Sequence, residues 1–446
     1  MRARAAALLV ALALLAVACP SGSNGAAGGP AFTGGAGRVP SVAPGGAPTA
    51  EAAINELCVA PAGTAGATST PTPSQGPTPP QIAQIEHQVE TVRGLSYEHP
   101  VAVVAVTSQE MQQRVEANFD QTFPADYYDR RTAAWRTIGV IPADADLREA
   151  YRTFLGGQVI GYYDPDSKEL VYEGSGSTEL GLEDRLVLAH ELTHALDDQH
   201  FDLTKLDDLA NRCEDERSEA ALGLVEGNAQ FVSAQTLVQF PSGDLGDALG
   251  ALLQGIGSQP DVAGVPPFVE ALEIWPYTQG LAFVTRLALD GGTAAVDAAF
   301  RDPPTTTEQV MHPDRYPSDV PSPVEVPDLS ADLGPGWGDL DAMDVGEEWL
   351  DAMLRLRLDG SVADDAAAGW DGGVYRAWTN GTDVAVVMDT AWDSAQDASA
   401  FASAAHDWIA KGDGPGSVST DGDHVTLSFA TDQSVLARID AATSQN

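Results

Sequence analysis

The sequence predicts an α+β protein in two folded parts: a mostly helical larger part with a small sheet, and a small α+β module at the C-terminus. Three observations lead to this prediction. Runs with apolar residues at helical spacing and few Gly or Pro fill the middle of the chain, above all around Val187–Leu196. Hairpin signals at Gln158–Tyr172 and Val374–Met388 add short strands. The chain has 446 residues, which is enough for a large core and for two units.

The N-terminus has the layout of a secretory signal. Two arginines precede an apolar run over residues 5–18, which is short for a membrane-spanning helix. Residues 16–18 match the small-x-small site of ordinary signal peptidase, whereas residues 15–19 resemble a bacterial lipobox with Cys19 as the lipidated residue. Ala16 departs from the lipobox, where a larger aliphatic residue is usual. We favour a signal peptide at 1–18, lipidation of Cys19 and an extracytoplasmic location with a lipid anchor at the cell membrane.

Composition divides the remaining chain into segments. Gly, Ala, Pro, Ser and Thr dominate the first of them, which predicts a low-complexity tether. A second stretch rich in Pro, Gly and Asp marks a later boundary. We therefore expect a tether at 19–80, a helical domain with a small sheet at 81–320, a linker at 321–344 and a C-terminal α+β module at 345–446.

Elements before residue 180 follow from local patterns. Apolar residues at helical spacing over 81–92 predict the first helix, and the β-rich run 101–106 predicts a strand. Two β-type runs around a Pro-containing turn predict the hairpin at 158–172. Further helices are expected at 109–119, 126–138 and 147–155.

Later elements follow in the same way. The helix around Val187–Leu196 begins with Glu183 and Asp184, which suit the positive end of a helix. A second long helix is expected at 214–239, because it contains few breakers. Asn380-Gly381 is a strong turn signal between the strands at 374–378 and 384–388. Other helices are expected at 268–274, 277–289, 293–300, 345–358 and 394–409, with a strand at 424–430.

Charge and cysteines limit the partners. The formal net charge is −42, with 65 Asp and Glu against 23 Lys and Arg, so the chain repels nucleic acid and anionic headgroups. We expect a peptide or protein substrate, no nucleic acid, membrane contact only through the anchor, and a monomer. Apart from Cys19, the cysteines are Cys58 and Cys213, which an oxidising compartment would allow to pair or leave free.

The strongest chemical signal is His190-Glu191-Leu192-Thr193-His194, an H-E-x-x-H motif in an apolar run. On a helix, two histidines four residues apart project from one face and can bind one Zn²⁺. Glu191 can reach a water on that metal. The alternative is a pair of histidines with purely structural contacts, but the surrounding pattern favours a zinc site.

Zinc needs a third protein ligand, and two candidates compete. Glu226 lies on the next long helix, between apolar neighbours. His200 lies ten residues after His190, as in the metzincin pattern. That pattern has Gly at a sharp turn, where this chain has Asp197, which adopts left-handed geometry less readily. We favour Glu226 and keep His200 as the alternative.

The motif and its surroundings resemble a group of bacterial secreted proteins with gluzincin-type H-E-x-x-H…E sites. The resemblance lies in residues 190–201, in Glu226-Gly227-Asn228-Ala229 and in residues 303–316, and covers about 84–320. It implies a zincin-like, thermolysin-like catalytic core with His190, His194 and Glu226 as ligands and Glu191 as base, but no particular substrate. Asn228 stands where the group has Asp, so an outer-shell carboxylate is missing. Gln230 could orient a ligand instead.

Two further features complete the predicted site. A tetrahedral intermediate needs a hydrogen-bond donor besides the metal, and Tyr277 and His312 are the candidates, each with a structural role as the alternative. The hairpin Val159–Tyr172 is either a substrate shelf, to which an extended peptide adds as a strand, or an ordinary structural hairpin.

Together these features predict an exported zinc metallopeptidase in which Glu191 is the general base for peptide hydrolysis by a zinc-activated water. One alternative is a non-catalytic zinc-binding lipoprotein of the cell envelope that serves as an interaction module. A second alternative places the function in the C-terminal module, with the zinc domain as its scaffold.

Overall fold

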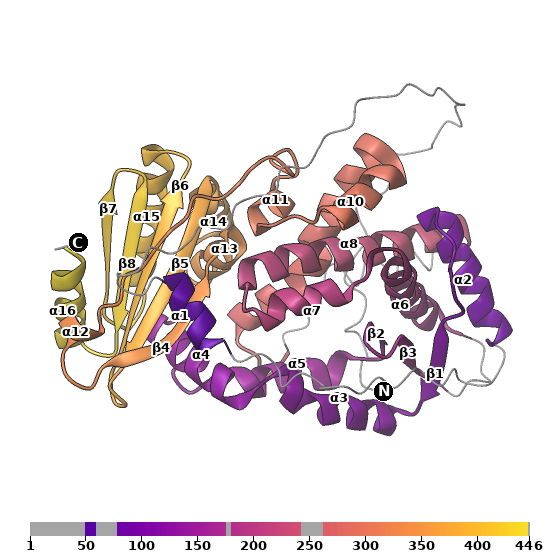
Figure 1. The fold of residues 1–446 in the computed structure, drawn as a ribbon, viewed down its shortest axis with the longest axis horizontal. Coiled ribbons are helices and arrows are strands. Elements are labelled where there is room, and N and C mark those ends of the chain that lie inside the picture. Colours follow the sequence, from indigo (N-terminus) through magenta and orange to yellow (C-terminus); the bar gives the residue numbers. More distant parts are fainter. Residues whose placement is uncertain (1–49, 59–77, 175–179, 242–261, 445–446) are drawn as a thin grey trace.

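The computed structural model describes residues 50–58, 78–174, 180–241 and 262–444 (Figure 1). Within these ranges the chain is α+β, as predicted. The signal peptide, Cys19 and most of the tether lie outside the described residues. None of the helices in these ranges has both the length and the apolar character that crossing a membrane requires.

The first part combines helices with a three-stranded sheet. The strand order is β1-β3-β2, with β1 parallel and β2 antiparallel to β3, so β2 is an edge strand. Thr107 caps α3, and Asp146 caps α5. The elements are α2 (Pro80–Arg93), β1 (Ala102–Val106), α3 (Ser108–Thr122), α4 (Ala125–Ile138), α5 (Leu147–Gln158), β2 (Gly161–Asp164) and β3 (Glu169–Glu173).

Long helices form the centre of the molecule (Figure 1). They are α6 (Leu182–Phe201), α7 (Thr204–Asn211), α8 (Asp215–Gln239) and α10 (Pro267–Arg301), followed by α11 (Thr307–Met311). The three helices expected between 268 and 300 are one element, α10, which contains Pro276 and is interrupted only at Gly292 (φ 65°). The left-handed φ at Gly292 is one that glycine adopts readily, so the kink falls there and not at the proline.

The C-terminal part is a five-stranded antiparallel sheet in the order β4-β5-β6-β8-β7, with helices on both faces. The sheet begins earlier than expected, because β4 lies in the range that the sequence predicts to be linker. The elements are α12 (Ser330–Leu333), β4 (Gly338–Asp344), α13 (Glu347–Arg355), α14 (Gly360–Ala367), β5 (Trp370–Thr379), β6 (Val384–Trp392), α15 (Ala395–Ala410), β7 (Gly416–Asp421), β8 (His424–Ala430) and α16 (Gln433–Thr443).

The two parts share one hydrophobic core. Trp135 of α4, Phe268 of α10 and Trp349 of α13 pack edge to face, with ring centroids 5.1–6.1 Å apart. The same buried cluster continues to Tyr375 and Met388 in the sheet. Burial of this size makes the C-terminal part an integral wall of the molecule.

The other face of the sheet is closed by α1 (Ala50–Leu57) and α16. A disulfide between Cys58 and Cys213, with Cα atoms 5.8 Å apart, ties the end of α1 to the segment before α8. The pairing that the sequence left open is therefore present in the structure.

Candidate metal centre

His190, His194 and Glu226 meet where α6 packs against α8. The Nε2 atoms of the two histidines are 3.0 Å apart, and Glu226 Oε2 lies 3.0 Å from His190 Nε2 and 3.5 Å from His194 Nε2. The two histidines are one turn apart and project from one face of α6, and the carboxylate comes from α8. Among the described residues, these three form the group that could hold a metal ion.

The electrostatics of this cluster favour the charged forms. Burial opposes a charge on His194, but Glu226, Glu191 and Asp197 raise its pKa to about 9. Burial also opposes a charge on Glu226, whereas the two histidines hold its pKa well below the usual range. Glu226 therefore favours its charged form and His194 its protonated form, and a bound cation would compete with the proton on His194.

Glu191 is held in place by the edge strand β2. Its Oε2 accepts the backbone N–H of Tyr163 at 2.8 Å, and its side chain is 9 % exposed. The hairpin is anchored a second time on Asp198, whose Oδ2 accepts from Tyr163 Oη and Lys168 Nζ, both at 2.7 Å. The edge strand β2 therefore lies beside the glutamate of the motif.

Tyr277 belongs to the same site. Its ring is stacked on His190 at a centroid distance of 6.1 Å. The charge of Glu226, followed by burial, raises the pKa of Tyr277 well above its ordinary value. The phenol therefore stays protonated at neutral pH and can donate a hydrogen bond.

The other two histidine candidates lie elsewhere. His200 is still helical, because α6 continues through Asp197 to Phe201, and its Nε2 pairs with the backbone oxygen of Ser96 at 2.9 Å. His312 follows α11 and pairs with Glu347 Oε1 of α13 at 2.9 Å. Neither of these two histidines is brought to the three clustered side chains.

Asn228, which stands where the resembled group has Asp, has a carboxylate of α6 as its partner. Its Nδ2 donates to Asp197 Oδ2 at 2.6 Å, and Asp197 Oδ1 accepts from Arg93 Nε at 2.8 Å. This buried network connects α2, α6 and α8 behind the histidines, and so fixes the crossing of the two ligand helices. In the described part of the chain no hydrogen bond joins Gln230 to a histidine or to Glu226.

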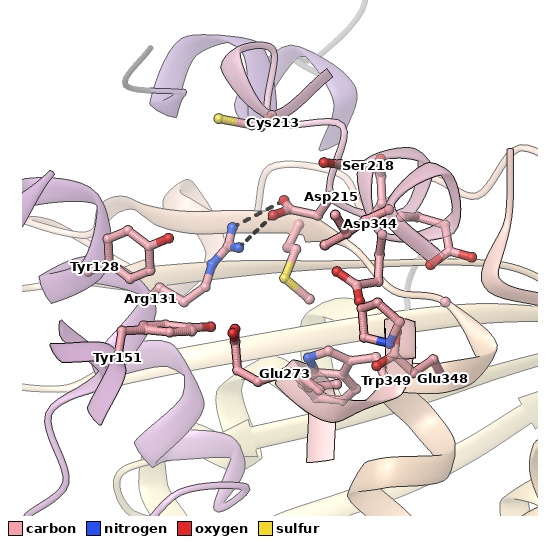
Figure 2. A pocket seen from close by; sticks show the side chains of 18 of the residues that line it. Tyr128, Arg131, Tyr151, Cys213, Asp215, Ser218, Glu273, Asp344, Glu348 and Trp349 are labelled. Carbon is pink, nitrogen blue, oxygen red and sulfur yellow. Dashed lines mark hydrogen bonds and ion pairs between the residues drawn. The ribbon is translucent and has the colours of Figure 1, made fainter. Parts of the chain in front are cut away.

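Sequence reasoning missed a cavity next to this cluster. The cavity measures about 290 Å³, and Tyr277 and several carboxylates line it (Figure 2). Two spacings could have indicated it: Glu219 lies seven residues before Glu226, and Glu273 lies four residues before Tyr277. Both spacings put a pair on one helix face.

Comparison with known proteins covers only the C-terminal part. Residues 334–442 match the family model described as Domain of unknown function (DUF8575). This range contains all five strands of the second sheet, including β4. No curated protein and no solved structure matches the chain.

Proposed function

We propose that the protein is an exported zinc-dependent metallopeptidase. The observation that carries this proposal is the meeting of three predicted ligands with Glu191 beside them, next to the edge strand β2. The resemblance of residues 84–320 to gluzincin-type proteins supports the same reading.

The donor set fits zinc in its chemistry and spacing. Two imidazoles and one carboxylate are a common catalytic zinc set, and tetrahedral ligands at about 2.0–2.1 Å from zinc lie roughly 3.3 Å apart. The three separations here are 3.0, 3.0 and 3.5 Å. In the described ranges no fourth His, Cys, Asp or Glu joins the group, so a coordination position would stay open for water.

Zinc held by His190, His194 and Glu226 would supply a water of lowered pKa and a Lewis acid for the scissile carbonyl. Glu191 would take the proton from this water and pass it to the leaving amine. Oε2 of Glu191 already accepts the N–H of Tyr163, which leaves Oε1 for the proton. Tyr277, protonated and stacked on His190, would donate to the oxygen on which negative charge develops.

The edge strand suggests how a peptide binds. β2 pairs with β3 on one side only, and Tyr163 and Lys168 anchor the hairpin to α6. An extended peptide that adds to β2 would lie along the histidines, and its backbone hydrogen bonds would give affinity without requiring a particular sequence.

Export is proposed on two grounds. The N-terminal segment has the composition of a signal peptide with Cys19 as a lipidation site. The Cys58–Cys213 disulfide suits an oxidising compartment.

The Glu191→Gln substitution tests the proposal. Loss of the base should lower cleavage of a casein substrate by about 10²–10⁴-fold, because general base catalysis contributes that much. Zinc content, measured by atomic absorption, should remain near one ion per chain. A Glu191→Gln protein that cleaves as well as wild type would refute the mechanism. Wild type that holds zinc but cleaves no peptide would favour the non-catalytic lipoprotein.

A further inference from the structure

The cavity next to the metal cluster is acidic, and both parts of the molecule contribute to it. α4 and α5 form one wall, the first half of α8 and the first third of α10 form another, and β4 with α13 closes it. In the view of Figure 2, the side chain of Glu273 lies between those of Tyr151 and Trp349. The acidic residues that line the cavity are Asp215, Glu216, Glu219, Glu273, Asp344 and Glu348.

Arg131 is the basic residue among the lining side chains, and its charge is already matched. Its Nη1 lies 3.0 Å from Asp215 Oδ1, and its Nε lies 3.2 Å from Asp341 Oδ2. Because Asp215 and Asp341 already neutralise its single positive charge, Arg131 does not neutralise the other lining carboxyls. Among the described residues, the cavity lining therefore has more acidic than basic side chains.

Glu348 gives independent evidence for a ligand. Its side chain is only 4 % exposed, lines the cavity, and has a buried Oε1 without a hydrogen-bond partner. Oε1 of Glu219 is likewise buried without a hydrogen-bond partner. Burial, and then the neighbouring glutamates, raise the pKa of each of these carboxyls well above its ordinary value. A buried carboxyl without a partner is costly, so these groups are suited to a cationic partner that arrives from outside.

Aromatic rings complete the lining. The rings of Tyr128 and Tyr151 pack edge to face on one side, with their centroids 5.4 Å apart, and Trp349 lies on the other side. Aromatic faces attract ammonium and guanidinium groups, and they also pack against the aliphatic stem of a long side chain. At about 290 Å³, the cavity is at the lower limit of small-molecule pockets, a size that suits one side chain.

The cavity and the proposed reaction centre lie along the same faces of α8 and α10. Tyr277 lines it and also stacks on His190. Glu219 and Glu226 are two turns apart on one face of α8, which is about 10 Å along the helix axis. A long side chain on a peptide bound at the metal cluster could therefore point into the cavity.

We propose that this cavity is a specificity pocket that binds the ammonium or guanidinium group of a Lys or Arg side chain in the substrate. The inference rests on the peptidase function proposed above and adds a substrate class to it. Within the described residues, the lining carboxylates do not converge as closely as metal ligands do, which favours an organic cation over a metal ion.

The first test uses quenched fluorescent peptides with acetylated N-termini that differ at one residue, Arg against citrulline or Lys against norleucine. Wild type should cleave the cationic peptide about tenfold faster or more, measured as kcat/KM. Glu348→Gln and Glu273→Gln should each lower this ratio by about tenfold, because each replaces a carboxyl that can ionise beside the bound cation with an amide that cannot. Glu325→Gln, which removes an exposed carboxylate, is the matched control and should keep the wild-type ratio.

A second readout does not depend on cleavage. N-acetyl-arginine amide should bind the full-length Glu191→Gln protein in calorimetry and lose at least tenfold in affinity when Glu348→Gln is added. If peptides are cleaved but the Arg ratio does not respond to either cavity variant, the specificity pocket is refuted and the peptidase stands. If the amide binds Glu191→Gln in this Glu348-dependent way but wild type cleaves no peptide, the cation site stands and the peptidase function is refuted.

A third comparison separates a side chain from a chain terminus. The same peptides with free N-termini would be preferred only if the cavity binds the terminal ammonium group. A cationic preference that disappears on acetylation would overturn the assignment to a Lys or Arg side chain. Circular dichroism and zinc content of the two cavity variants identify a variant that has failed to fold.

Discussion

Glu226 and His200 illustrate how position on a helix decides which side chain reaches a common point. His200 is ten residues after His190 on the same continuous helix, and its ring turns to Ser96. Glu226 is 36 residues from His190, yet its Oε2 lies 3.0 Å from His190 Nε2. His200 lies about 15 Å from His190 along the axis of α6, too far to join His190 and His194, so the third group comes from a neighbouring helix, α8.

Substitution of Glu226 and of His200, one at a time, tests which of the two side chains binds zinc. Glu226→Gln should weaken zinc binding by more than the ~10–100-fold that is typical for loss of an outer-shell partner. His200→Gln should leave zinc affinity unchanged, since its ring contacts the backbone oxygen of Ser96. Competition with a chromophoric chelator measures both. If His200→Gln loses zinc and Glu226→Gln retains it, His200 and not Glu226 is the third zinc ligand.

At the scale of elements, the crossing of α8 and α10 decides where Glu226 lies. A Cβ on Gly227 would come within 2.1 Å of the Gly280 backbone, and one on Gly280 would come within 1.9 Å of Gly223 O. The helices can be this close only because all three residues lack a side chain. The same helix contact positions Glu226 and Tyr277, each close to one of these glycines, so that both lie against His190.

The Gly227→Ala substitution tests this packing. Its methyl group would meet backbone, which cannot move aside as a flexible side chain can, so it should lower the free energy of unfolding by at least about 1–3 kcal/mol. Zinc affinity should fall with it, because the helices must separate. Urea unfolding and chelator competition measure the two effects. Gly414→Ala, where the added Cβ meets nothing within 4 Å, is the control; equal effects in both variants would contradict the argument.

At the scale of the whole molecule, the C-terminal part is a wall of the site as well as a sheet of its own. Trp349 packs against Trp135 and Phe268 in the shared core, while Glu348 beside it lines the acidic cavity. The family match over residues 334–442 covers these two residues of α13. One alternative places the function in the C-terminal module and makes the rest of the chain a passive scaffold. That alternative has to explain why the module and the helical part together line one cavity.

The buried carboxyls at this junction predict how stability depends on pH. Burial raises the pKa of Glu273 from 4.5 to about 7. Burial, together with Asp344 and Glu347, raises that of Glu216 to about 8, against the hydrogen bonds from Thr307. The fold favours their neutral forms, so their contribution to stability is complete below pH 4.5 and is lost as the pH rises through 7 and 8.

Glu273→Gln, which resembles the neutral carboxyl, should therefore gain stability relative to wild type as the pH rises from about 3.5 to about 8, which is about one unit beyond the shifted range on either side. The urea midpoints of the two proteins at each pH give the difference, and Glu325→Gln should follow wild type. A constant difference across this range would show that Glu273 ionises normally. Arg131, Glu219 and Glu348 face the same cavity, and all of them are kept in both proteins.

The sequence alone determined what depends on near neighbours. The spacing of His190 and His194 places them on one face of any helix, and alternation with turn residues gives the hairpins. Only the tertiary structure brought Glu226, and not His200, to His190 and His194, paired His312 with Glu347, and assembled the acidic cavity. Those contacts join residues that are tens to hundreds of positions apart, and packing between helices, rather than local pattern, brings them together.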